Sequence, residues 1–290
     1  MSWLSVGAAT IHRVEELRAP FPIAMFNAGE DLLARHAHWL QPDWVDANGN
    51  WEMVVQSFII EVDGRIIVVD PCVGNGRSLP DFPLFDNLDT PFIERFGATG
   101  IRPDEVDGVF CTHLHSDHCG WNTSLRGGRY VPTFPKARYY MGRREVERWD
   151  TRLPGHVAVP ENRGVFEASV LPILEAGLAE IIGDAHAISP SLEAVLADGH
   201  TLGHMALHLA SEGAHAWFTG DAFHHPIELI HPELDAGTCE DIALSTATHH
   251  RLLDTLIGQG AIIIPAHFAE PHAGHVREEA GQRIFVPLGR

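Results

Sequence analysis

Residues 112–120 read Thr112-His113-Leu114-His115-Ser116-Asp117-His118-Cys119-Gly120. Four side chains that can bind a metal ion fall within six consecutive positions of this stretch, in the pattern H-x-H-x-D-H. In an extended loop, residues two positions apart project to the same side, so His113 and His115 can share one ion while Asp117 and His118 turn toward a second. The stretch therefore predicts a metal centre, and the interpretation of the fold starts from it.

Further ligand-type residues lie beside predicted strands elsewhere in the chain. Residues 106–112, which lead into the histidine stretch, have the length and β-branched content of a buried strand. His204 precedes another predicted strand, Asp221 follows a third and His267 follows a fourth. Strand ends are where open sheets place their chemistry. Each ion needs one more imidazole, and a bridging carboxylate holds two ions roughly 3.5–4 Å apart, so these residues are the expected suppliers.

The composition is that of a globular protein with ample material for a core. Hydrophobic residues make up 45% of the 290 residues, and the mean hydropathy is −0.04. No apolar run approaches the roughly 18 residues of a membrane span. We therefore expect one domain over residues 1–290 and no insertion into a membrane.

Net charge and cysteine content indicate which binding partners and which cellular compartment suit the chain. Acidic residues outnumber basic ones by 39 to 20, for a formal charge of −19. Such a surface repels polyphosphate, so nucleic acid is a poor partner and a small-molecule substrate is expected. The first residues lack the segments of a signal peptide, and the four scattered cysteines fit reduced thiols. The sequence thus predicts a cytoplasmic protein.

Local patterns predict the main elements. Asp63-Gly64 suits a two-residue hairpin turn between strands at 53–62 and 65–70. Further strands are expected at 138–141, 205–210, 216–219 and 261–264, and helices at 142–149, 166–176 and 242–257. Residues 20–51 are too apolar for a free tail. They could cover the metal site, form a homodimer interface or simply pack on the domain.

The ordered set of a H-x-H-x-D-H stretch, a later His, a later Asp and a last His resembles the metallo-β-lactamase-fold hydrolases. The resemblance spans roughly residues 53 to 270. It implies an α/β fold of four layers, αββα, in which two mixed β-sheets pack face to face with helices outside. It also implies that His113, His115 and His204 bind the first metal, that Asp117, His118 and His267 bind the second, and that Asp221 bridges both. Asp70 matches the family's aspartate that orients a ligand histidine.

The activity that this resemblance implies is hydrolysis by a metal-bridging hydroxide, with Asp117 and Asp221 in the catalytic centre. Two cations that share a water lower its pKa to near neutrality, and one of them polarises the substrate's carbonyl or phosphoryl oxygen. Imidazole and carboxylate ligands suit Zn²⁺ first, and iron, manganese and cobalt are also compatible. We therefore expect two divalent metal ions as cofactors.

Differences from the motifs of other branches of the family argue against several of the activities that this fold supports. Asp221 argues against a true β-lactamase, which lacks the bridging aspartate, and His115 argues against the oxygen-reducing iron proteins, which carry Glu there. The short tail after His267 leaves little room for a glyoxalase-II-like extension. The segments 70–75 and 120–122 look most like the branch that holds acyl-homoserine lactonases and methyl-parathion-hydrolase-like enzymes. The resemblance thus implies that the enzyme opens a lactone or cleaves a small ester.

One position departs from the lactonases. They carry a tyrosine three residues after the bridging aspartate, where this chain has His224. Imidazole can also donate a proton, so His224 is a candidate acid for the leaving alkoxide, although it could simply cap the loop before Pro226. Cys119 is expected to pack behind the histidine loop. Three aromatic residues flank the predicted ligands and could form the wall of the substrate pocket or merely pack in the core: Trp121, Phe223 and Phe268.

Three other functions are compatible with parts of the pattern. A phosphotriesterase would use the same two metals to attack phosphorus instead of carbon. A non-catalytic metal-binding module would be expected to lack a ligand, whereas all seven are present in order. An oxidoreductase with a single iron is opposed by Asp117, His118 and His267, which supply a second site.

Overall fold

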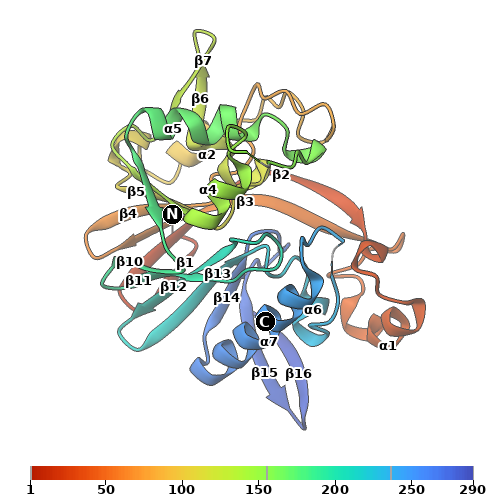
Figure 1. Ribbon diagram of the computed structural model, residues 1–290. Helices are drawn as coiled ribbons and strands as arrows, with labels where there is room; N and C mark the ends of the chain where they lie inside the picture. The colour runs from red at the N-terminus through yellow and green to blue at the C-terminus, as the bar shows by residue number, and fades with distance from the viewer. Residues whose placement is uncertain (1, 155, 236, 290) are drawn as a thin grey trace.

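The strands of the molecule form two large sheets and one small hairpin. The structure, a computed structural model, describes residues 2–154, 156–235 and 237–289 (Figure 1). The first sheet has the strand order β1 (Leu4–Val6), β2 (Ala9–Pro22), β3 (Asn50–Val62), β4 (Arg65–Val69), β5 (Gly108–Cys111), β8 (Arg138–Gly142), β9 (Ala179–Ile182). The second has the order β10 (Ala185–Ser189), β11 (Leu192–Leu196), β12 (Met205–Ser211), β13 (Ala214–Gly220), β14 (Ile262–Pro265), β15 (Gly274–Glu279), β16 (Gln282–Pro287). The hairpin pairs β6 (Thr123–Arg126) with β7 (Arg129–Pro132).

Helices cover the outer face of each large sheet (Figure 1). Helices α2 (Phe92–Gly97), α4 (Arg143–Trp149) and α5 (Leu171–Glu175) lie over the first sheet, and α6 (Pro226–Ile230) and α7 (Ile242–Gln259) lie over the second. Among the described residues, the remaining helices are α1 (Glu30–Leu40) and α3 (Ser116–Cys119), the 3-10 helices η1 (Ile23–Phe26), η2 (Pro103–Glu105), η3 (Gly120–Asn122) and η4 (Pro160–Asn162), and the π-helix η5 (Phe166–Val170). This is the αββα arrangement expected from the sequence.

The central strands are apolar on both faces because each sheet is covered on both sides. In β4, Ile67 and Val69 join the core between the sheets, while Val68 points to the core beneath the outer helices. In β13, Phe218 faces the other sheet and Trp217 faces α7. Since successive strand residues point to opposite faces, continuous apolar runs are what a doubly covered sheet requires.

The predicted elements all appear, with small differences at their ends. The turn between β3 and β4 has Asp63 at φ 54° and Gly64 at φ 70°, and a type I′ hairpin turn needs positive φ at both positions. Within residues 20–51, which the sequence left undecided, the chain forms the end of β2, then η1 and α1. No described helix combines the length and apolarity needed to cross a membrane.

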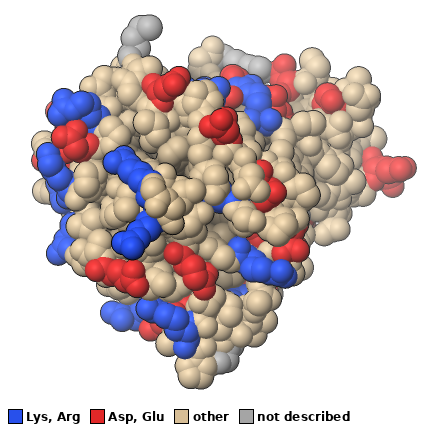
Figure 2. Space-filling model, turned by 90° about the horizontal axis from the view of Figure 1, so that it is seen from above, with Lys and Arg blue, Asp and Glu red and all other residues tan. Residues whose placement is uncertain are grey.

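Strand direction brings the predicted ligands to one edge of the molecule. Strands β4 and β5 run parallel, so Asp70 and His113 follow them at the same end. Strands β13 and β14 are also parallel, which places Asp221 and His267 together. On the face seen in Figure 2, acidic and basic side chains are interspersed rather than gathered by sign.

Candidate metal centre

The histidine stretch changes from an extended loop to a helical turn, and this change aims its side chains at two places. His113 and His115 follow β5, and their Nε2 and Nδ1 atoms lie 2.9 Å apart. Asp117 and His118 lie on the single turn α3. The rings of His113 and His118 have centroids only 4.0 Å apart, so the two halves of the stretch remain adjacent.

Asp221 lies between the two halves with one carboxylate oxygen toward each. Its Oδ1 is 3.2 Å from Nε2 of His118 and 3.1 Å from Nε2 of His267. Its Oδ2 is 3.5 Å from Nε2 of His200 and 3.9 Å from Nε2 of His113. A carboxylate in this position can bridge two metal ions.

The second group is completed by Asp117 and His267. Oδ2 of Asp117 lies 3.7 Å from Nε2 of His118 and 3.6 Å from Nε2 of His267. Nδ1 of His267 is 2.9 Å from the carbonyl oxygen of Val54, a bond that leaves Nε2 directed at the carboxylates. Three ligand atoms thus converge, as the sequence led us to expect.

The predicted ligand His204 does not join either group. Its ring is buried, Nδ1 lies 3.1 Å from the carbonyl oxygen of Ala197, and Nε2 accepts the backbone N–H of Asp221 at 3.1 Å. His200 takes its place, with Nε2 at 3.1 Å from Nδ1 of His115. Both histidines belong to the segment 199–204, and the predicted ligand is the one adjacent to β12. The first group therefore comprises His113, His115 and His200.

Asp70 fixes the orientation of His118. It stands at the end of β4 with φ 47°, and its Oδ2 accepts a hydrogen bond from Nδ1 of His118 at 3.0 Å. Its Oδ1 accepts the backbone N–H of Thr112 at 2.7 Å. With Nδ1 held in this way, Nε2 of His118 points at Asp221, which is the orienting contact expected of Asp70.

Among the candidate ligands, two buried side-chain atoms lack hydrogen-bond partners within the described residues. They are Nε2 of His118 and Oδ1 of Asp221, which face each other. Burial lowers the pKa of His113 and His200 well below the usual histidine range, with neighbouring imidazoles adding to the effect at both residues. Neutral imidazole is the form that binds a metal, so these two residues suit a divalent cation. At His118, in contrast, the carboxylates of Asp221, Asp117 and Asp70 outweigh burial and raise the pKa well above the usual range.

His224 also lies beside Asp221, and it contacts Glu228, which no sequence pattern predicts. Its Nε2 lies 3.3 Å from Oδ2 of Asp221, and its Nδ1 lies 3.7 Å from Oε1 of the buried Glu228. Oε2 of Glu228 accepts the backbone N–H groups of His224 and His225 at 2.6 and 2.9 Å. Burial alone would lower the pKa of His224, but the carboxylate of Asp221, with Glu228, outweighs it and raises that pKa to about 10.

Two buried side chains hydrogen-bond to the peptide groups of Leu114, which lies between His113 and His115. No sequence pattern predicts these two contacts. The N–H of Leu114 donates to Oε2 of Glu145 and its carbonyl oxygen accepts from Nδ2 of Asn162, both at 3.0 Å. Glu145 also accepts hydrogen bonds from Trp149 and Thr201. Because Thr201 adjoins His200, Glu145 ties together two loops that carry ligands.

A cavity of about 580 Å³ opens at this cluster. The polar part of its wall includes the proposed ligands His115, Asp117, His200, Asp221 and His267, with His224. The apolar part is formed by Phe21, Met25, Trp51, Met53, Phe82, Phe85 and Val159. Residues 20–51 therefore contribute to the wall, which is one of the roles that the sequence left open for them.

The aromatic residues expected in this wall lie elsewhere. Trp121 stacks on Phe92 at 5.2 Å and donates its Nε1 hydrogen to Glu16 at 2.6 Å. Phe223 stacks on the ring of His249 at 4.6 Å. Of the two roles left open for Trp121, Phe223 and Phe268, the structure therefore supports packing in the core, because all three are buried and none lines the cavity.

Phe268 and Cys119 are packing residues as well. The Phe268 ring has its centroid 6.2 Å from that of Trp44 and 5.7 Å from that of Phe285. The Cys119 thiol donates to the carbonyl oxygen of His115, and burial raises its pKa to about 12. Cys119 thus lies behind the loop as a neutral thiol, and all four cysteines are free.

Solved structures with a similar fold include several hydrolases. The chain matches the hydrolase AbOPH in the beta lactamase superfamily with a TM-score of 0.81 and 19% identity, covering 99% of this chain and 97% of that one. It matches AidC, a dizinc quorum-quenching lactonase in complex with its product, with a TM-score of 0.78 and 17% identity over 99% and 97% of the two chains. A probable metal-dependent hydrolase from Staphylococcus aureus gives 0.76 and 16% over 99% of both chains. At these identities the likeness shows the fold, and no curated protein matches significantly in sequence.

The sequence itself carries the family relationship. The family model for the metallo-beta-lactamase superfamily matches residues 50–267, which include the histidine stretch, Asp221 and His267. That match spans well over half of the chain and agrees with the two-sheet fold. The chain therefore belongs to the metallo-beta-lactamase superfamily.

Proposed function

We propose that this protein is a dinuclear metal-dependent hydrolase that opens a lactone or cleaves a small ester. The observation that carries the proposal is the position of Asp221 at the floor of the 580 Å³ cavity, with Oδ1 toward one ligand group and Oδ2 toward the other. The structure of AidC, a dizinc lactonase in complex with a product, supports the substrate class by analogy of fold.

The proposed ligands replace one residue of the set expected from the sequence. His113, His115 and His200 would hold one ion, Asp117, His118 and His267 the other, and Asp221 both. The unpartnered Nε2 of His118 and Oδ1 of Asp221 would gain partners from such ions. Zinc is the first choice for this donor set, and iron, manganese and cobalt also fit it. Two bound cations supply a water of lowered pKa and a Lewis acid for the substrate oxygen.

The residues of the chain have distinct tasks around that centre. Met25 and Met53 provide the apolar wall against which an acyl chain packs. The carboxylates of Asp117 and Asp221 face the cavity and can accept the proton of an attacking water. His224 lies beside Asp221 and can donate a hydrogen bond to the leaving oxygen of the substrate.

A hydrolysis screen tests the function. Wild type and Asp221→Ala, both with measured metal content, are assayed on lactones, aryl esters and phosphotriesters. We expect wild type to hydrolyse a lactone or ester, and the variant to lose at least a hundredfold in kcat/KM, or roughly 3 kcal/mol of transition-state stabilisation. Equal rates for the two proteins on every substrate would show that this centre carries no activity, and a preference for phosphotriesters would favour the alternative activity.

Metal content and His224 are tested separately. Two equivalents of metal are expected after loading, and fewer than two would contradict the dinuclear centre. His224→Phe should lower kcat for substrates with poor leaving groups while keeping both equivalents. Loss of metal in this variant would make His224 a ligand instead of a donor. Cytoplasmic location and assembly through residues 20–51 stay predictions from the sequence, for cell fractionation and light scattering to test.

A further inference from the structure

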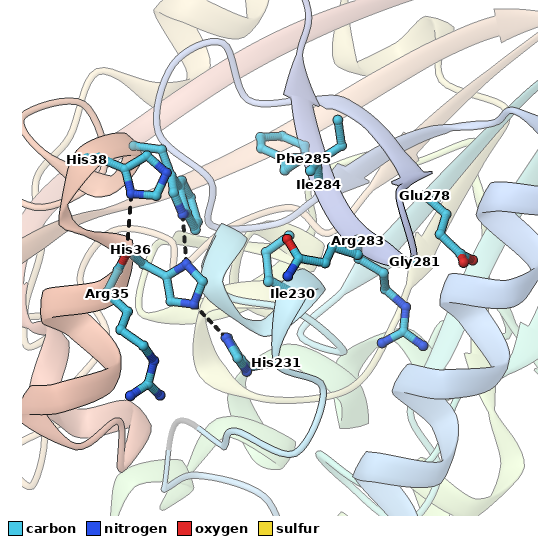
Figure 3. A pocket seen from close by; sticks show the side chains of 12 residues that line it. Arg35, His36, His38, Ile230, His231, Glu278, Gly281, Arg283, Ile284 and Phe285 are labelled. Atoms are coloured by element: carbon cyan, nitrogen blue, oxygen red, sulfur yellow. Dashed lines mark hydrogen bonds between the residues drawn. The ribbon is translucent and has the colours of Figure 1, made fainter.

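A second cavity lies between α1, the C-terminal end of α6 and the β15–β16 hairpin (Figure 3). Its volume is about 840 Å³, which falls in the range of about 300–1,000 Å³ typical of small-molecule sites. None of the described residues that line it belongs to the proposed ligand set or to the wall of the first cavity. It is therefore a separate place on the molecule.

Among the described residues, two arginines and one glutamate line this cavity, so its wall carries a small positive charge although the whole chain carries −19. Arg35 of α1 and Arg283 of β16 both line it. Within the described part of the chain, no carboxylate comes within 4.0 Å of either guanidinium. Glu278 is the sole carboxylate among the described lining residues, and it stands opposite Arg283 in the hairpin register without forming such a pair. Two arginines thus remain available to an anion.

The imidazoles of the cavity, in contrast, have partners: Nδ1 of His38 lies 3.2 Å from the carbonyl oxygen of Arg35, and His36 and His231 contact each other. Nε1 of Trp39 donates to Nδ1 of His36 at 3.0 Å, which leaves the hydrogen of His36 on Nε2. That nitrogen lies 2.8 Å from Nε2 of His231, and Nδ1 of His231 lies 3.2 Å from a carboxylate oxygen of Glu233. The chain of bonds joins α1 to the end of α6 and holds this wall in one arrangement. In Figure 3 the guanidiniums of Arg35 and Arg283 lie on either side of His231.

The rest of the wall is apolar. Trp39, Ile230, Ile284 and Phe285 line the cavity beside the charged groups. Phe285 is itself held in the core, with its ring centroid 5.7 Å from that of Trp44. A ligand that contacts both the arginines and the apolar wall therefore needs a negative charge and an apolar body.

We propose that this cavity binds a small organic anion, a carboxylate attached to an apolar chain or ring. The carboxylate binds at one of the two guanidiniums, that of Arg35 or that of Arg283, because each offers charge-assisted hydrogen bonds to its oxygens. The apolar body packs on Trp39 and Phe285. The proposal rests on these side chains alone and does not depend on the proposed hydrolysis.

Calorimetric titration of the full-length, metal-loaded protein with octanoate tests the proposal, with 1-octanol as the uncharged comparison. We expect saturable binding of octanoate, and a loss of affinity of about tenfold or more in the Arg35→Ala/Arg283→Ala double variant. The matched control is Arg126→Ala/Arg129→Ala, which removes the same charge from exposed positions on the β6–β7 hairpin and should leave the affinity unchanged. Binding of 1-octanol should be equal in all three proteins.

Three results would overturn the proposal. The first is an octanoate affinity that is the same in the Arg35→Ala/Arg283→Ala variant and in wild type. The second is binding that disappears when a chelator removes the metal, which would place octanoate at the metal centre. The third is no binding by wild type together with a change in oligomeric state in the double variant, which would make this cavity an interface between two copies of the chain.

Discussion

Asp221 is the residue through which the two halves of the candidate centre meet, and its position depends on the glycine before it. Gly220 has φ 52°, and a Cβ there would lie 2.6 Å from Nε2 of His204 and 2.6 Å from Oγ1 of Thr112. Only glycine allows this backbone conformation so close to neighbouring side chains. His204 then accepts the N–H of Asp221, so its ring helps to fix the backbone of the carboxylate that we propose as the bridge.

Substitution of the two histidines of segment 199–204 should therefore have different effects, one on metal content and the other on stability. His200→Ala should remove about one equivalent of metal and most of the hydrolytic activity, with little effect on the stability of the metal-free protein. His204→Ala should lower the free energy of unfolding by about 2 kcal/mol or more, since it leaves the buried N–H of Asp221 and the carbonyl of Ala197 without partners. Metal analysis and urea unfolding of the metal-free variants measure both. A one-equivalent metal loss in His204→Ala alone would restore His204 as the ligand.

Glu145 should make stability depend on pH. Burial raises its pKa from 4.5 to about 7, so the folded protein keeps this carboxyl protonated at pH values where the unfolded chain ionises it. Its contribution is full below pH 4.5 and falls as pH rises through the window from 4.5 to about 7, by at most about 1.4 kcal/mol per pH unit. The neutral isostere Glu145→Gln should gain stability relative to wild type over that window.

Urea unfolding of the metal-free proteins at pH 5.0 and pH 7.5 measures this difference. Glutamine can still accept the N–H of Leu114 and donate to the hydroxyl of Thr201, so the variant keeps the contacts of the protonated acid. A difference between the two proteins that stays constant from pH 5.0 to pH 7.5 would contradict a raised pKa for Glu145.

At the scale of elements, the residue that follows β4 hydrogen-bonds to α3 and orients it. Asp70 bonds to His118 on α3 and to Thr112 at the end of β5, so one residue aligns two strands and a ligand. The other end of the same strand has an exposed counterpart, because the backbone N–H of Ile66 donates to Asp107 at 2.8 Å. The two aspartates offer a matched comparison within one element.

Asp70→Ala should weaken the second metal site by about 10–100-fold, because Nδ1 of His118 loses the acceptor that fixes the ring. Competition for zinc with a chromophoric chelator gives the affinity. Asp107→Ala should leave that affinity unchanged even if it lowers stability slightly. Equal metal affinities in the two variants would mean that His118 is oriented by its own packing.

The segment between β2 and β3 should govern which substrates fit. Met25 lies in η1 and lines the first cavity, whereas Trp121 is buried against Phe92. Met25→Ala should raise KM for substrates with long acyl chains while short-chain substrates keep their kcat, because only the wall changes. Trp121→Phe should lower stability through the lost bond to Glu16 and leave KM unchanged. Steady-state kinetics over a series of chain lengths decides between these outcomes.

For the whole molecule, the two-sheet fold could be predicted because its signals are local. A pattern of only a few residues identifies each of three features: the Asp63-Gly64 turn, the apolar strands and the histidine stretch after β5. The ligands at strand ends follow from parallel pairing of β4 with β5 and of β13 with β14, which any such sheet shares.

Contacts between distant segments could not be predicted. Which histidine of segment 199–204 faces His115 depends on how the loop before β12 folds against the loop after β5. Glu145 and Asn162 reach Leu114 from α4 and η4, so their role has no local pattern. The cavity wall likewise comes from residues 21–25 and 81–85, which meet only in the folded molecule.

Removal of metal should destabilise the entire fold, because the proposed ligands join loops from both sheets. Metal that binds only the folded state adds RT ln(1 + [L]/Kd), about 4 kcal/mol at a thousandfold excess over Kd. Without it, the buried carboxylate of Asp221 and the imidazole of His118 face each other with unsatisfied atoms. Dialysis against a chelator should therefore lower Tm by several degrees, and zinc should restore it. In a His113→Ala/His118→Ala variant, which lacks one proposed ligand of each ion, the chelator should have far less effect. A chelator-induced shift of equal size in this variant and in wild type would show that the stabilising metal binds elsewhere.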